Sequence, residues 1–186
     1  ASNDDGITAL NYGSGETSVT SKGSIIALGY NGVFALNDET STSTDIDVNA
    51  DIISAYNHGI KTLNQGSGST SIIATGIVKG GVGQTDQTAN SDGIYAWNET
   101  TTKNLSITAK DVTGLDDGIF AINKGTGFLD ITVSGDVAST STDKSDEYYS
   151  YGIYASGYGT DVTVSAARDV TSNDAGISAR NYGSGK

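Results

Sequence analysis

Apolar residues recur at every second position in short segments along the whole chain, and all but one of these segments end in asparagine. The recurring pattern is G-[IV]-x-[AT]-x-N, in which the branched residue, the small residue and the asparagine share one parity. Alternation with a period of two is typical of β-strands, whereas helices show a period near 3.6. The copies are 24 to 34 residues apart and begin at Gly6, Gly32, Gly59, Gly93, Gly118, Gly152 and Gly176. The pattern therefore predicts a strand at the same place in each repeat of a solenoid.

A second alternating segment and a short apolar corner follow each copy of this motif. The second segment carries pairs such as Ile131 and Val133, or Val162 and Val164, and the corner ends in a branched residue such as Val112. Three short strands and three turns per repeat make up one coil of a parallel β-helix. We therefore predict an all-β fold, a parallel β-helix (β-solenoid) of about six to seven coils of 24–34 residues, with three short strands per coil.

The two ends of the sequence resemble each other more closely than they resemble the copies between them. Residues 2–15 and 172–185 agree at 11 of 14 positions and are 170 residues apart. We therefore expect residues 1–186 to be a single β-helix segment, uncapped at both ends, that represents one 170-residue period of a longer array. The two longest repeats predict loop insertions at 80–92 and 139–151. The parent gene tests the longer array, because a complete product of about this size would contradict it.

The asparagine that closes the motif occupies one corner of the predicted coil. Stacked asparagines can bond from coil to coil as an amide ladder, as stacked amides do in cross-β assemblies. Alternatively, each asparagine is a turn-former that tolerates a left-handed backbone, which is consistent with its replacement by Gly157 in one copy. Both interpretations are structural. The residues of this asparagine column are Asn11, Asn37, Asn64, Asn98, Asn123 and Asn181.

The opposite parity of the motif strand faces outward if the branched and small residues face inward. In the middle copies this parity is aromatic or large and apolar, and equivalent positions are expected to stack into a stripe. An exposed apolar stripe typically marks a contact surface, here for lateral packing against another copy or for stacking on sugar rings. The alternatives are that aromatic neighbours simply stabilise the sheet or that a long loop covers them. The candidate interaction stripe comprises Phe34, Tyr95, Trp97, Phe120, Ile122 and Tyr154.

Composition fits this architecture and removes several classes of function. The 186 residues include no proline, no cysteine and 25 glycines, which we expect at turns that need positive φ, such as residues 11–15 and 123–127. The absence of cysteine excludes disulfides, thiol catalysis and cysteine-ligated metals. Ten basic against 22 acidic residues give a net charge of −12, which disfavours nucleic acids and anionic membranes as partners. No apolar run is long enough to cross a bilayer, so we expect no membrane insertion of this segment.

Few side chains form a pattern that suits catalysis. Asp111, Asp136 and Asp169 share one corner, but other copies carry unrelated residues there, so we interpret them as solvated turn residues. His58 stands at another corner without an evident partner. We interpret it as a turn residue, because metal sites and triads need further groups in reach. We therefore expect no catalytic residue, no metal and no cofactor. The alternative is a polysaccharide-cleaving β-helix enzyme of lyase or phage tailspike type, which needs clustered carboxylates.

The phrase GIxAxN-x-GxG followed by a [IV]-x-[VA]-x-x-G-x-V strand resembles the repetitive passenger region of bacterial type V autotransporters and related surface adhesins. The resemblance extends from Gly6 to Gly185. It implies a right-handed parallel β-helix, export across both membranes, and a secreted or cell-surface location. On this basis we expect a structural segment of a bacterial extracellular fibre or cell-surface adhesin, a stiff stalk with adhesion or lateral self-association through the stripe. The expected partners are other copies of the chain, end to end or side by side, or host and cell-surface glycans or proteins.

Overall fold

The computed structural model describes residues 3–41, 46–86, 89–142 and 149–185, and its regular structure consists of β-strands arranged in two sheets. In the first sheet the strands, in spatial order, are β1 (Ile7–Asn11), β3 (Val33–Asn37), β5 (Ile60–Asn64), β7 (Ile94–Asn98), β9 (Ile119–Asn123), β12 (Tyr151–Gly157) and β15 (Ala175–Asn181). In the second sheet they are β13 (Val162–Ala166), β10 (Leu129–Val133), β8 (Leu105–Gly114), β6 (Thr70–Lys79), β4 (Ile46–Ala55) and β2 (Thr17–Ala27), with β11 (Val137–Ser139) and β14 (Val170–Thr171) paired alongside.

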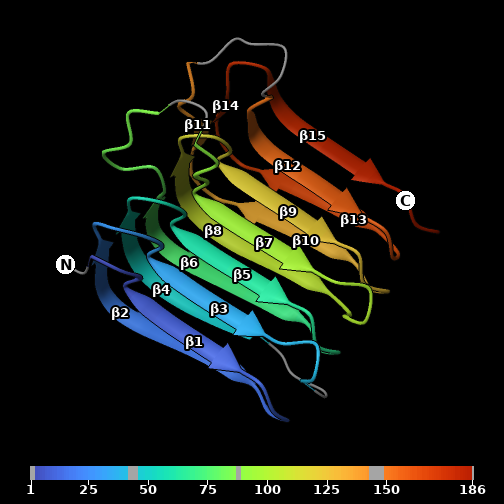
Figure 1. The fold of residues 1–186 in the computed structure, drawn as a ribbon. Coiled ribbons are helices and arrows are strands. Elements are labelled where there is room, and N and C mark those ends of the chain that lie inside the picture. The colour runs from blue at the N-terminus through green and yellow to red at the C-terminus, as the bar shows by residue number, and fades with distance from the viewer. Residues whose placement is uncertain (1–2, 42–45, 87–88, 143–148, 186) are drawn as a thin grey trace.

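Every copy of the motif forms one strand of the first sheet, and neighbouring copies pair in parallel without a shift. Ile94 lies opposite Ile119, and Asn98 lies opposite Asn123. The sheet therefore progresses along the sequence from β1 to β15 (Figure 1). A one-residue slip would turn every buried side chain outward, so the period-two pattern itself fixes the register. The predicted all-β fold with parallel strands is confirmed.

The core lies between the two sheets. The branched residues of the motif strands, for example Ile60, Ile94 and Ile119, are fully buried. They pack in one hydrophobic cluster with residues of the second sheet such as Leu105 and Ile131. Burying one such side chain stabilises a fold by about 1.5–3 kcal/mol. The predicted inward parity of the motif is thus confirmed, and the opposite parity lies on the outer face of the first sheet.

The second part of the repeat differs from the predicted pair of short strands. In β2, β4, β6 and β8 the two segments form one strand of 10 or 11 residues. Register shifts between Ala50 and Ile53 and between Ala74 and Ile77 interrupt the pairing of these long strands. An extra residue at such a bulge bends the strand, so the predicted turn becomes a bend within a continuous strand. In the last repeats the segments are separate, as β10 with β11 and β13 with β14.

Most glycines of the expected turns are not explained by the predicted positive φ. Among the described glycines, positive φ occurs only at Gly15, Gly81 and Gly83, so most glycines of the expected turns do not need it. Close approach of the neighbouring repeat explains the glycines of the turn at 123–127 instead. A Cβ on Gly125 would lie 2.6 Å from the carbonyl oxygen of Thr102 in the preceding repeat. The prediction of positive φ is confirmed at Gly15 but was wrong for the turn at 123–127, because stacking of successive repeats excludes side chains where their backbones lie this close.

The predicted loop insertions at 80–92 and 139–151 lie only partly within the described ranges, since residues 87–88 and 143–148 fall outside them. The first insertion packs against the end of β4 and the turn that follows. The N–H groups of Gly81 and Val82 donate to the carbonyl oxygens of Asn57 and Ala55 at 2.8 and 2.9 Å. Within the described ranges the chain forms no helix, and hence none with the length and hydropathy to cross a membrane.

Candidate interaction face and buried polar corner

The outer face of the first sheet carries the predicted stripe in two adjacent columns. The side chains in both columns are half-buried across the middle of the sheet. The first column, in spatial order, is Phe34, Lys61, Tyr95, Phe120 and Tyr154. The second contains Leu36, Leu63, Trp97 and Ile122. Lys61 therefore separates Phe34 from the other aromatic residues. We call this outer face, with its two columns, the contact face.

Three rings of the first column stack on one another along the sheet. The ring centroids of Tyr95 and Phe120 are 5.2 Å apart with their planes 12° from parallel. Those of Phe120 and Tyr154 are 5.1 Å apart at 10°. Aromatic pairs at such distances stabilise a structure by about 0.5–1.5 kcal/mol beyond their burial. The in-register pairing produces this stack, because equivalent side chains of parallel strands lie side by side.

Cations close both ends of the aromatic stack. The Lys61 ammonium lies 5.3 Å from the centroid of the Tyr95 ring. The Arg180 guanidinium lies 5.5 Å from that of Tyr154. Each of the three rings therefore has two neighbours along the column, a ring or a cation on either side. Stacking on a sugar needs an open ring face, so this geometry favours packing against a protein surface.

Trp97, the single tryptophan, belongs to a small polar cluster on the same face. Its indole N–H donates to Glu99 Oε1 at 2.8 Å. The Lys124 ammonium lies 4.4 Å from the Trp97 ring and 3.5 Å from Glu99 Oε2. The predicted stripe omitted Lys61, Lys124 and Arg180, although alignment of the motif copies places Lys61 and Arg180 on the outward parity.

The Tyr95 phenol on the same face has a raised pKa. Burial is the main cause, and the charges of Asp92 and Glu99 add to it, so this group stays neutral at physiological pH.

The asparagine column lies at the ends of the motif strands and makes two kinds of contact. Asn37 donates to Asn64 Oδ1 at 3.5 Å, and Thr70 Oγ1 bridges Asn64 and Asn98 at 3.2 and 2.6 Å. Ladder-like contacts thus connect neighbouring repeats. In addition, backbone N–H groups two residues along the chain donate to the amide oxygens of Asn11, Asn64, Asn123 and Asn181. Such contacts are typical of turn-forming asparagines.

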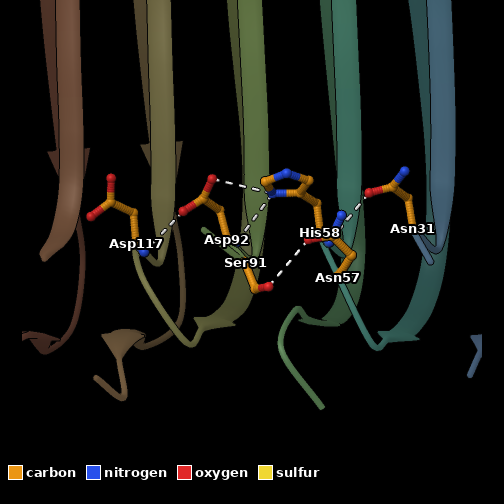
Figure 2. A network of polar contacts seen from close by, with 6 residues as sticks. All are labelled: Asn31, Asn57, His58, Ser91, Asp92 and Asp117. Atoms are coloured by element: carbon orange, nitrogen blue, oxygen red, sulfur yellow. Dashed lines mark hydrogen bonds and ion pairs between the residues drawn. The ribbon is translucent and has the colours of Figure 1, made fainter. Parts of the chain in front are cut away.

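A buried polar column runs along the opposite ends of the same strands, at the residue before the motif glycine in four successive repeats (Figure 2). Each of these four side chains accepts a hydrogen bond from the backbone N–H of the equivalent residue in the next repeat. Asn31 Oδ1 accepts from His58 N at 3.3 Å, and His58 Nδ1 accepts from Asp92 N at 3.1 Å. Asp92 Oδ1 accepts from Asp117 N at 2.9 Å, and Asp117 Oδ1 accepts from Tyr151 N at 2.6 Å. These contacts satisfy backbone donors that the turn leaves without a strand partner.

His58 is not the isolated turn residue that the sequence suggested. It is 4% exposed, and its Nδ1 atom lies 3.2 Å from Oδ2 of Asp92, which is 1% exposed. The His58 ring also contacts Tyr95, with the centroids 5.1 Å apart. The interpretation of a partnerless histidine was wrong, because the insertion at 80–92 separates the two residues in sequence while stacking brings them together. Alignment of the copies on the motif glycine places His58 and Asp92 at the same position, and this was the available sign of their contact.

Two carboxyl groups at this corner have strongly shifted pKa values. Burial raises the pKa of the Asp117 carboxyl to about 9, the negative charge of Asp92 adds to the shift, and the hydrogen bond from Tyr151 N–H opposes it. Burial and the charge of Asp92 raise the pKa of Asp116 to about 7. A carboxyl group that is removed from water and placed beside another one retains its proton.

The aspartates of the other corner form no comparable cluster. Asp136 and Asp169 are exposed, and Asp111 accepts a hydrogen bond from Asp136 N–H at 3.1 Å. Lys110 lies 3.7 Å from Asp111. In the part of the chain that the structure describes, no group of three or more histidine, aspartate or glutamate side chains is placed to hold a metal ion.

Comparisons with protein-family models, with curated proteins and with solved structures found no match.

Proposed function

We propose that this chain is a stalk segment of a bacterial extracellular fibre or cell-surface adhesin, which packs side by side with other copies through its contact face. In this proposal the two sheets belong to a right-handed parallel β-solenoid of about six to seven coils. The observation that carries it is the closed stack of Tyr95, Phe120 and Tyr154 on the outer face of the first sheet. The resemblance to autotransporter passengers supports the surface location.

The parallel pairing supports the role of a stalk. Each repeat adds one strand to each sheet, which lengthens the molecule by about 4.8 Å. The backbone hydrogen bonds and the hydrophobic core continue through the middle of the chain from one repeat to the next. A structure that grows in one direction with constant cross-section provides stiffness and reach. Electron microscopy of native material tests this role, and compact particles in place of thin fibres would contradict it.

Charge supports a second copy as the partner of the contact face. Lys61, Lys124 and Arg180 lie on this face, although the chain carries a net charge of −12. The outer side of the second sheet carries a local acidic patch near β10 and β13. Asp130 and Asp161 line a hollow of about 300 Å³ there, together with Phe128 and Thr163. Opposite charges on the contact face and at this hollow favour packing of the contact face of one copy against the hollow of the next.

Replacing both Tyr95 and Phe120 with serine is expected to weaken self-association roughly 100-fold, because central aromatic residues in an interface each contribute about 1–2 kcal/mol or more. Sedimentation velocity over a range of concentrations measures the change. The matched control replaces Tyr30 and Tyr149, which are exposed outside the two columns, with serine. Unchanged association of the Tyr95/Phe120 variant, with its β-sheet circular dichroism intact, would remove the contact face from the proposal.

A charge swap tests the front-to-back arrangement. One variant carries Lys61→Glu and Arg180→Glu, and the other carries Asp130→Lys and Asp161→Lys. Each variant alone is expected to remain monomeric, since its contact face and its hollow then carry charges of the same sign. An equimolar mixture is expected to associate, because complementary sides are then restored. A mixture that remains monomeric while the wild-type protein associates would show that copies pack in another orientation.

A further inference from the structure

A second hollow, of about 280 Å³, lies where the 80–92 insertion packs against the turns that follow β2 and β4. Three of its residues, Tyr30, Asn57 and Ser91, each stand two positions before a motif glycine, so they belong to three successive repeats. None of its residues belongs to the contact face, which makes this hollow a separate surface. The polar and aromatic side chains that line it are those of Tyr30, Tyr56, Asn57, Gln84, Asn90 and Ser91.

Backbone hydrogen bonds between repeats hold this hollow in shape. The Asn57 N–H donates to the Tyr30 carbonyl oxygen at 3.1 Å, and the Gly81 N–H donates to the Asn57 carbonyl oxygen at 2.8 Å. On the other side the Ser91 carbonyl oxygen accepts from Leu115 N at 2.8 Å. The walls are therefore in place before a ligand arrives, which lowers the entropic cost of binding.

Two tyrosine rings at the hollow are exposed to solvent. Tyr30 is 58% exposed and Tyr56 is 38% exposed. Unlike the stacked rings of the contact face, neither has another ring or a cation packed against it among the described residues. Their apolar surface is therefore open to a ligand that presents apolar groups of its own.

Three carboxamide side chains at the same hollow have unused hydrogen-bonding capacity. Ser91 Oγ donates to Asn57 Oδ1 at 3.1 Å, which fixes this carboxamide and leaves its nitrogen to donate elsewhere (Figure 2). No hydrogen bond to another described residue engages the side chains of Gln84 and Asn90. A carboxamide combines N–H donors with a carbonyl acceptor, and a hydroxyl group both donates and accepts. The carboxamides therefore match a ligand that is rich in hydroxyl groups.

We propose that this hollow is a binding site for one neutral sugar residue of a glycan. A sugar ring presents apolar C–H groups on its faces and hydroxyl groups at its edge. The C–H groups pack against the tyrosine rings, and the hydroxyl groups exchange hydrogen bonds with the carboxamides. The volume of the hollow lies just below the roughly 300–1,000 Å³ of typical small-molecule sites, so it suits one ring better than a longer chain. The inference does not depend on the lateral packing proposed above, because the two surfaces share no residue.

Other classes of ligand fit the hollow less well. The described residues that line it include no charged side chain, so an anion or a cation finds no counter-charge there. A purely apolar ligand would remove water from the carboxamides and leave them without partners, which is unfavourable. A neutral ligand that carries both C–H faces and hydroxyl groups satisfies both kinds of side chain.

An NMR titration of the wild-type protein tests the site directly. The probes are the methyl glycosides of glucose, galactose, mannose and N-acetylglucosamine, and methyl glucuronoside is the charged comparison. At least one neutral glycoside is expected to shift the side-chain amide signals of Asn57, Gln84 and Asn90, with a dissociation constant on the order of 1 mM for a ligand this small. If no neutral glycoside shifts these signals, or if only the charged one does, the proposal is wrong.

Substitutions locate the bound sugar. Tyr56→Ala and Gln84→Ala are each expected to weaken binding of the glycoside by about tenfold, since one removes apolar contact and the other a hydrogen-bonding group. Tyr12→Ala removes a tyrosine that is exposed directly after β1, and this matched control is expected to bind as the wild type does. Full binding by both hollow variants would place the sugar elsewhere and overturn the assignment.

The variant with serine at positions 95 and 120 separates this proposal from the lateral packing. It is expected to bind the glycoside with wild-type affinity even when its self-association is lost, because the hollow keeps all of its side chains. Loss of glycoside binding in this variant, with its circular dichroism intact, would move the sugar to the contact face and overturn the site proposed here.

Discussion

Replacement of Gly118 with alanine is expected to destabilise the fold by about 3 kcal/mol, the upper part of the usual range for overpacked cores. Gly118 precedes β9 in the motif, at a point where successive repeats approach closely. A Cβ there would lie 2.5 Å from the Gly152 carbonyl oxygen and 2.5 Å from Val137 Cγ1. Neither neighbour can withdraw freely, because Gly152 belongs to the adjacent strand and Val137 is buried in the core. Urea unfolding followed by circular dichroism measures the loss.

Gly23→Ala is the matched control for this substitution. Gly23 lies within β2, and a Cβ at this position would have no atom within 4 Å. Its replacement is expected to change the free energy of unfolding by less than about 1 kcal/mol, in the stabilising direction, since alanine restricts the unfolded chain. Equal effects of the two substitutions would mean that close stacking of repeats is not what requires glycine before the motif strands.

Asn123→Asp is expected to destabilise the fold by on the order of 3 kcal/mol, because several buried acceptors lose their donor. The Asn123 amide group donates to the carbonyl oxygens of Lys103 at 3.0 Å and Phe128 at 2.9 Å. Its oxygen accepts from Gly125 N at 3.1 Å. An aspartate of the same shape keeps the last bond and turns the other contacts into repulsion between oxygens. The midpoint of urea unfolding at pH 7 reports the effect.

Asn181→Asp serves as the control for this prediction. Asn181 makes the same kind of turn contact, since its oxygen accepts from Gly183 N at 2.8 Å, and its amide donates to Thr160 O in a solvent-exposed setting. Water can satisfy an acceptor there, so the loss is expected to stay below about 1 kcal/mol. If Asn123→Asp were as mild as the control, the asparagine column would act only through its turn-forming oxygens.

The candidate site was predictable in its positions but not in its contacts. Alignment of the motif copies places Tyr95, Phe120 and Tyr154 in one column, and the period of two assigns them to the outer face. That Lys61 and Arg180 close the stack depends on where long side chains lie, which alternation does not specify. The same holds for the buried corner. Alignment places His58 and Asp92 in one column, but only the folded chain shows their side chains directed along it.

The sequence by itself determined that the chain is all-β, which parity is buried, and which residues share a column, because parallel strands with a two-residue period permit one register. Only the tertiary structure decided how closely the repeats stack, which side chains meet between them, and which groups lose access to water. Close stacking explains the glycines before the motif strands. In the folded chain the second and third predicted strands form one continuous strand, and burial raises the pKa values of Asp116 and Asp117. Packing and desolvation depend on which residues are neighbours in space. A sequence pattern predicts those neighbours only where the repeat period identifies them.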